Sequence, residues 1–319
     1  MSITGLFFEI IKSYLFCFYK IRYNINVENI KNIGVKLVCK LNPKVDFAFK
    51  KLFGSEENKS ILIAFINSIL DEKNKINDIE LKNPYNISNY KNGKMTILDI
   101  KAVDEKGIWY DIEMQIAEQG FYDKRALYYW SKVYSDQIES GYDFTILRKT
   151  IAINILDFNY LKEEDFHNTY KIYNEKTKEE FSDLFEMHFI ELTKFKKDYK
   201  DLKTALDRWV SFLNKAYEID KDEMPKELAE DENIRKAVEK LEIMYLDKEE
   251  REIYENDLKA LIIHKAEIKT AEEKGEKKGE KNKAIEIVLE MLKDGEPIEK
   301  IVKYSKLSEK DILELKKRV

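Results

Sequence analysis

Two short runs of alternating apolar residues, joined by a tight loop, constrain the fold of this chain more than any other feature. In residues 95–103 and 108–116 most apolar side chains recur at every second position, which is the period of a half-buried β-strand. The loop between the runs suits a three-residue hairpin turn that ends in Gly107 in the left-handed conformation. We therefore predict a β-hairpin in which Asp104 pairs with Ile108.

The register of this hairpin sets two acidic residues against each other. Counting back from the loop, Lys101 falls opposite Asp111 and Asp99 falls opposite Glu113. Opposed side chains on one face of an antiparallel pair lie ~5 Å apart at Cβ, a distance at which two carboxylates repel each other. A divalent cation bound by both acids would remove that repulsion. The hairpin therefore indicates a metal site.

Two other interpretations of the hairpin stay open at this point. A polar face that is turned to solvent needs no metal to explain its acids. A four-residue loop would pair Val103 with Ile108 and would place Asp99 and Glu113 on opposite faces. Because that register loses the match between the apolar positions of the two strands, it is disfavoured.

Composition and charge exclude several classes of function. The net charge of −5 argues against a protein that binds nucleic acid through a global positive field. The two cysteines, Cys17 and Cys39, lack the spacing of a zinc site or a disulfide framework, which fits a reducing cytoplasm. The three histidines stand far apart with no nucleophile pattern around them, so a hydrolase triad is not expected.

A series of motifs runs through residues 42–196. It opens with Asn42–Gly54, which reads NPKVDFAFKKLFG, and continues through residues 61–70, Asp99, Glu113–Gln115, Arg125, Tyr129, residues 151–156 and residues 189–195. In their order and spacing these motifs resemble the Rpn family of recombination-promoting nucleases, which are transposase-like members of the PD-(D/E)xK nuclease superfamily.

The resemblance implies an α/β fold, in which a PD-(D/E)xK nuclease-like mixed sheet is flanked by helices and followed by a mostly helical C-terminal region. It also implies that Asp99 and Glu113 are the acids of the motif and bind Mg²⁺, with Mn²⁺ as a possible substitute. Gln115 stands where the superfamily usually has a lysine, and an amide can orient a water molecule but carries no charge. Asp46 is a candidate extra acid on the first helix, although an ion pair with Lys50 one turn later would also explain it.

A predicted helix over residues 122–140 carries a cationic face. Helical spacing places Arg125, Tyr129 and Lys132 on that face. The face could contact DNA phosphates beside the acids, because the guanidinium of arginine pairs with phosphate. It could equally be a solvated face on which a cation rests on an aromatic ring. Under the first interpretation these three residues and Lys50 are the candidate phosphate contacts.

The sequence predicts four parts along the chain. Residues 1–40 form an N-terminal extension whose apolar run is too short to span a membrane, and we expect it to contribute little to folding. Residues 41–196 form the nuclease-like domain, in which the continuous apolar run 150–158 predicts a central strand. Residues 197–270 form a helical region, with helices predicted over residues 198–216 and about 229–268. Residues 271–319 form a charged linker helix and a small helix-turn-helix-like tail, with Ser308 as a predicted N-cap. The acids of this tail favour a protein contact over DNA, for example a homo-oligomer formed through the C-terminal helices.

Taken together, these features predict a cytoplasmic, Mg²⁺-dependent DNA endonuclease that is associated with recombination or mobile elements. The alternative is a nuclease-fold module that binds DNA or a protein and is catalytically weak or inactive. A toxin-like or phage-defence effector would use the same chemistry in a different biological setting.

Overall fold

The computed structural model describes residues 40–84, 99–118, 120–219, 223–242 and 246–316. The chain divides into two compact units, Met1–Lys259 and Ala260–Val319. The predicted extension lies outside the described residues except for Lys40, and so do both cysteines and the first four residues of the predicted hairpin.

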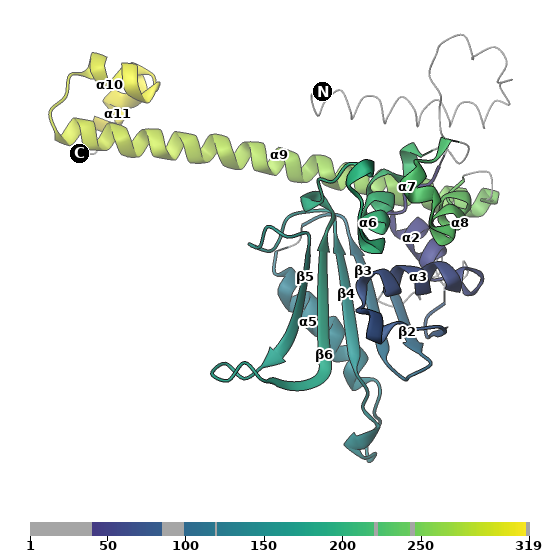
Figure 1. Ribbon diagram of the computed structural model, residues 1–319. Helices are drawn as coiled ribbons and strands as arrows, with labels where there is room; N and C mark the ends of the chain where they lie inside the picture. The colour runs from purple at the N-terminus through teal and green to yellow at the C-terminus, as the bar shows by residue number, and fades with distance from the viewer. Residues whose placement is uncertain (1–39, 85–98, 119, 220–222, 243–245, 317–319) are drawn as a thin grey trace, which may run out of the picture. The chain divides into compact units, whose positions relative to one another are not determined.

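The first unit is built around a mixed β-sheet (Figure 1). Its strands are β1 (Ile79–Leu81), β2 (Ile100–Asp104), β3 (Trp109–Gln115), β4 (Thr150–Leu156), β5 (His167–Tyr173) and β6 (Glu180–Glu191). They are arranged in the order β1-β2-β3-β4-β6-β5, and β4 runs parallel to both of its neighbours. Every residue of β4 is buried, as expected for a central parallel strand. The predicted mixed sheet is confirmed.

Helices cover both faces of this sheet. The helices of this unit are α2 (Asp46–Phe53), α3 (Lys59–Ile69), α5 (Tyr122–Ser135), α6 (Ala205–Lys215), α7 (Lys226–Ala229), α8 (Glu232–Lys240) and the first part of α9 (Lys248–Lys293). Helix α5 packs on one face, against Ala152 and Leu156 of β4. The other face carries Ile100 of β2, which lies under Gly54 at the end of α2. The two faces of β2 and β3 therefore meet different helices.

Aromatic side chains hold the helices of the second face together. Trp209 of α6 is fully buried, and its ring centroid lies 6.0 Å from that of Phe53 in α2 and 5.6 Å from that of Phe65 in α3. Phe212, one turn further along α6, contacts Trp209 edge-on at 5.6 Å. Tilted and edge-on contacts of this kind are the favoured geometries for aromatic pairs. They fix α2, and with it the side chains that α2 carries toward the sheet.

The hairpin between β2 and β3 has the predicted register. Lys101 pairs with Asp111, and the backbone N–H of Asp104 donates to the carbonyl oxygen of Ile108 at 3.0 Å. Gly107 has a φ of +80°, in the left-handed region. Asp104 also closes the loop with its side chain, because Oδ1 accepts from the N–H of Lys106 and of Ile108. The three-residue loop is confirmed, and the four-residue alternative is wrong.

Two predicted helices are shorter than expected. Helix α5 ends at Ser135 and does not continue to residue 140, and the chain then turns through Gly141, which has a φ of +94°. The helix predicted from Asp198 begins at Ala205. Thr204 fixes that start, because its side chain accepts from the N–H of Asp207 in a capping box. Local capping and turn geometry therefore set both boundaries.

The single helix predicted over residues 229–268 is wrong. Helix α8 starts after Asp231, whose side chain accepts from two backbone N–H groups, and ends at Lys240, while α9 begins at Lys248. The charged stretch 271–281 belongs to α9, which continues for 46 residues. Among the described helices, none combines the length and apolar character needed to cross a bilayer.

The second unit contains α9 from Ala260 onward, α10 (Ile298–Ser305) and α11 (Glu309–Lys316). These three helices share a small core formed by Val288, Ile301 and Ile312. The side chain of Ser308 accepts from the backbone N–H of Asp311 at 3.2 Å, so the predicted N-cap is confirmed.

The hairpin loop gives a stability prediction. Replacing Gly107 with Val should lower the free energy of unfolding by about 1–2 kcal/mol, because a β-branched residue is strained at positive φ. Urea denaturation of the purified protein measures this change. The control is Gly120→Val, where φ is ordinary and the position is open, and it should cost less than about 0.5 kcal/mol. Equal losses in the two variants would contradict the predicted role of the loop.

Candidate active site

The hairpin register brings two predicted site residues into direct contact. Asp99 immediately precedes β2, and its Oδ2 accepts from the backbone N–H of Met114 in β3 at 2.9 Å. The backbone N–H of Asp99 in turn donates to Oε1 of Glu113 at 3.0 Å. Glu113 lies on the face of the sheet that α5 covers, beside Asn154 of β4. Asp99 and Glu113 are therefore held together by the pairing of the two strands.

A third acid, Asp111, joins them and was not identified from the sequence. It lies two residues before Glu113 on β3 and so points to the same face, and only 1% of it is exposed. Its Oδ1 has no hydrogen-bond partner among the described residues. The signal that could have found it is its spacing of two from Glu113 on a predicted strand.

The pKa values of all three acids are raised, with burial as the largest cause in each case. Burial, followed by repulsion from Asp99, raises the pKa of Asp111 to about 7. Burial and the charges of Asp99 and Asp111 raise the pKa of Glu113. Burial also raises the pKa of Asp99, against the opposing effect of the Lys50 ammonium. Each carboxylate is therefore costly to ionise without a nearby cation.

Lys50 and Asp46 reach the same place from α2. The Lys50 Nζ atom lies 3.1 Å from Oδ1 of Asp99 and 2.8 Å from Oδ1 of Asp46. Burial alone would lower the pKa of Lys50, but the two carboxylates outweigh burial and raise it. The ion pair expected between Asp46 and Lys50 is present, and it extends to the acids of the hairpin.

Gln115 lies at the end of β3, two residues beyond Glu113 and on the same face. Its Nε2 donates to the backbone carbonyl oxygen of Ala117 at 3.1 Å. Gln115 therefore shares strand β3 with Asp111 and Glu113, and its amide group is hydrogen-bonded to the backbone.

The cationic face of α5 is only partly as expected. The Nε of Arg125 donates to the hydroxyl of Tyr129 at 3.0 Å, and the guanidinium lies 5.1 Å from the centre of that ring. Tyr129 is only 8% exposed, which corrects its predicted place on an open face. Its ring packs against the core beside Val133, because α5 must bury one side against the sheet. The charge of Arg125 partly offsets the rise in the pKa of Glu113, which places Arg125 near the acids.

A family model described as PD-(D/E)XK nuclease family transposase matches residues 43–271, well over half of the chain. The chain belongs to this family. The match agrees with the Rpn resemblance drawn from the motifs and with the mixed α/β sheet. Searches of curated proteins and of solved structures gave no significant match.

The residues of this PD-(D/E)XK family member fit a divalent cation by their donor chemistry. Carboxylate oxygens are the hard ligands that Mg²⁺ and Mn²⁺ prefer, and the buried Oδ1 of Asp111 has no hydrogen-bond partner in the described part of the chain. Over the described part of the chain, no three His, Cys, Asp or Glu side chains already converge on one point. Instead, the oxygens of Asp99 and Glu113 accept hydrogen bonds from the protein itself.

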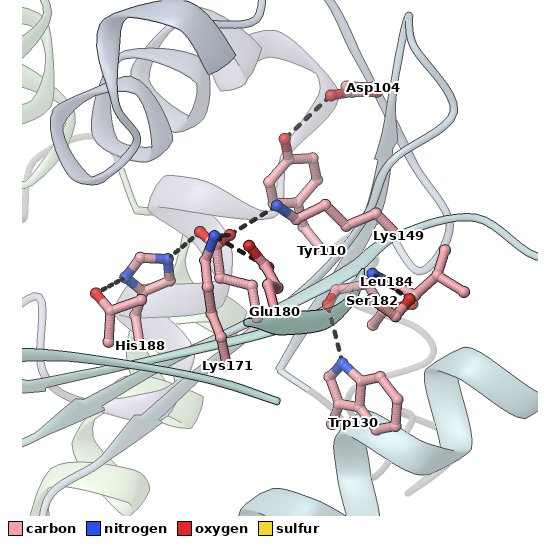
Figure 2. Close-up of polar contacts among 12 residues, drawn as sticks. Asp104, Tyr110, Trp130, Lys149, Lys171, Glu180, Ser182, Leu184 and His188 are labelled. Carbon is pink, nitrogen blue, oxygen red and sulfur yellow. Dashed lines mark hydrogen bonds and ion pairs between the residues drawn. The ribbon is translucent and has the colours of Figure 1, made fainter. Parts of the chain in front are cut away.

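A second polar cluster of the same protein differs in being charge-compensated (Figure 2). Glu186 of β6 is buried, and its two oxygens lie 2.8 Å from Nε2 of His188 and 2.6 Å from Nζ of Lys149. Burial alone would raise the pKa of Glu186, but these contacts lower it to about 2. Nδ1 of His188 lies 2.9 Å from Nε2 of His167 and 3.1 Å from the hydroxyl of Thr169. Because the Lys149 ammonium neutralises the buried carboxylate, we interpret this cluster as part of the structural framework.

The raised pKa of Asp111 predicts how stability depends on pH in the metal-free protein. A carboxyl with a pKa of about 7 when folded and 3.8 when unfolded binds its proton more tightly in the folded state. The free energy of unfolding should therefore fall as pH rises from about 4 to about 7 and level off above that. Asp111→Asn should flatten this fall and stabilise the protein at pH 8 by on the order of 1 kcal/mol.

Urea denaturation in EDTA across this pH range measures the effect. Glu80→Gln on β1 is the matched control, because that side chain is 66% exposed and should leave the profile unchanged. An Asp111→Asn profile that follows the wild type would contradict the assignment of a strained, buried carboxyl at Asp111.

Proposed function

We propose that this PD-(D/E)XK family member is a DNA endonuclease that hydrolyses phosphodiester bonds with Mg²⁺, or with Mn²⁺ in its place. The observation that supports this most is the cluster of Asp99, Asp111 and Glu113 on one strand pair, in which Asp111 and Glu113 are buried and the Asp99 side chain is 11% exposed. Such a cluster raises the pKa of each acid and destabilises the fold, a cost that is typical of functional sites. Because the chain belongs to a nuclease family, phosphodiester hydrolysis is the reaction we infer for this cluster.

The acids and Gln115 have separate roles in the proposed reaction. Asp99 and Glu113 would hold the ion, which when bound supplies an activated water and neutralises charge on the phosphate. Gln115 would position that water through Oε1, since its Nε2 already donates to Ala117. Asp46 would hold the Lys50 ammonium beside Asp99.

DNA would be bound along the cationic face of α5. Arg125 lies near Glu113 and would contact the phosphate beside the acids, while Tyr129 would hold its guanidinium in place. Lys132 lies seven residues along the same helix, ~10 Å further along the axis, and would contact a neighbouring phosphate. Lys50 is a further candidate phosphate contact. Local contacts of this kind suit a chain whose net charge is −5.

The transposase description of the family links the fold to mobile elements. Within this proposal, cleavage of DNA during recombination or transposition is the biological setting.

Conservative changes of the two proposed ligands test the function. Asp99→Asn and Glu113→Gln should each lower plasmid nicking by at least about 100-fold, because each removes a charged metal ligand while keeping the shape of the side chain. Nicking of supercoiled plasmid in Mg²⁺, Mn²⁺ and EDTA measures this loss. Glu80→Gln, an exposed acid of the same sheet, should cleave like the wild type.

Cleavage that persists in EDTA, or that survives Asp99→Asn unchanged, would exclude the metal-dependent mechanism. A wild-type protein that binds DNA without cutting it in either metal would favour the alternative, a nuclease-fold binding module.

A further inference from the structure

The environment of Lys50 differs from that of an ordinary helical lysine. Its side chain is 9% exposed, and its Nζ bonds to one carboxylate of its own helix and to a second one, Asp99, which immediately precedes β2. Helix α2 packs on the face opposite α5, so this side chain brings a positive charge from one layer to the acids of the other.

The neighbouring lysine shows that this placement is specific. Lys51 follows on the same helix and pairs with Glu250 of α9, away from the hairpin acids. The two side chains have the same chemistry and adjacent positions, yet only Lys50 contacts the cluster. Lys51 therefore provides a matched control.

The contacts of Asp99 explain why the acids do not already form a cage for a metal. Its Oδ1 faces the Lys50 ammonium at 3.1 Å, and its Oδ2 accepts from the backbone N–H of Met114 at 2.9 Å. The backbone bond belongs to the strand pairing, so Oδ1 is the oxygen that a metal ion would have to take. An ammonium and a divalent cation on the same oxygen repel each other strongly at such short range.

We propose that Lys50 is a tethered cation that competes with the divalent metal ion for Oδ1 of Asp99. The inference rests on the proposed function in that it takes Asp99 as a metal ligand. In the metal-free protein the ammonium offsets the repulsion within the acid cluster. When a metal ion loads, the ammonium leaves Asp99 and keeps Asp46 as its partner. Lys50 therefore sets the metal concentration at which the site fills.

Isothermal titration with Mn²⁺ tests this competition in the full-length chain. Lys50→Gln should bind Mn²⁺ ~10-fold or more tightly than the wild type, because the competing charge is gone. Lys51→Gln should bind like the wild type, and Lys50→Arg, which keeps the charge, should not gain affinity. Equal or weaker Mn²⁺ binding by Lys50→Gln would overturn the proposal, as would the same gain in Lys51→Gln.

A second measurement uses the wild-type protein and does not depend on the folding of a variant. NMR of protein labelled with ¹⁵N-lysine follows each ammonium as Mg²⁺ is added, with Lys50→Arg used to assign the signal. The Lys50 resonance should shift with saturation of the site, and the Lys51 resonance should stay in place. A Lys50 signal that is unmoved at saturating Mg²⁺ would overturn the competition.

Plasmid nicking by the same samples separates this proposal from the proposed function. A wild type that does not nick, together with tighter Mn²⁺ binding by Lys50→Gln, would reject the endonuclease and leave the tethered cation in place. A wild type that nicks plasmid, together with equal Mn²⁺ affinities of the wild type and Lys50→Gln, would support the endonuclease and reject the tethered cation. If neither protein binds Mn²⁺, both proposals are rejected.

Discussion

The pairing of β2 with β3 is the interaction on which the site depends. Their backbone register determines that Asp99 stands across from Glu113, and the side-chain to backbone bonds between the two strands hold both acids in place. A slip of one residue would move every side chain of one strand to the other face and separate the acids. Asp104 and Gly107 prevent this slip by fixing the loop. The strands thus hold like charges together, although those charges repel.

The repulsion explains the surroundings of the acids. A cation from α2, Lys50, and one from α5, Arg125, approach the hairpin from the two helical layers. The aromatic contacts of Trp209 fix α2, and the packing of Tyr129 and Val133 fixes α5. The hydrophobic core therefore contributes to the electrostatics of the site, because the packing of α2 and α5 determines where Lys50 and Arg125 lie. The remaining negative charge is what makes a divalent ion a fitting ligand.

The sequence predicted the hairpin, its register and the central strand, since these follow from local periodicity and turn chemistry. It did not predict the burial of Asp111, because the opposite position holds Lys101 and that lysine instead pairs with Asp136 and lies over Trp109. The contact between Lys50 and Asp99 was also missed. It joins residues 49 positions apart and depends on how α2 packs on the sheet, which no local pattern records. The predicted ends of helices such as α5 were wrong for a related reason, because capping and turn geometry determine where a helix stops.

Anomalous diffraction from crystals of the wild-type protein soaked in Mn²⁺ shows directly whether a metal ion binds between Asp99 and Glu113. We expect an anomalous peak at the manganese edge within about 2.6 Å of carboxylate oxygens of both residues. We also expect the Lys50 ammonium to have moved away from Asp99 in the same crystals. The absence of a peak between these two acids at saturating Mn²⁺, or peaks only at acids on the protein surface, would contradict the proposed metal site.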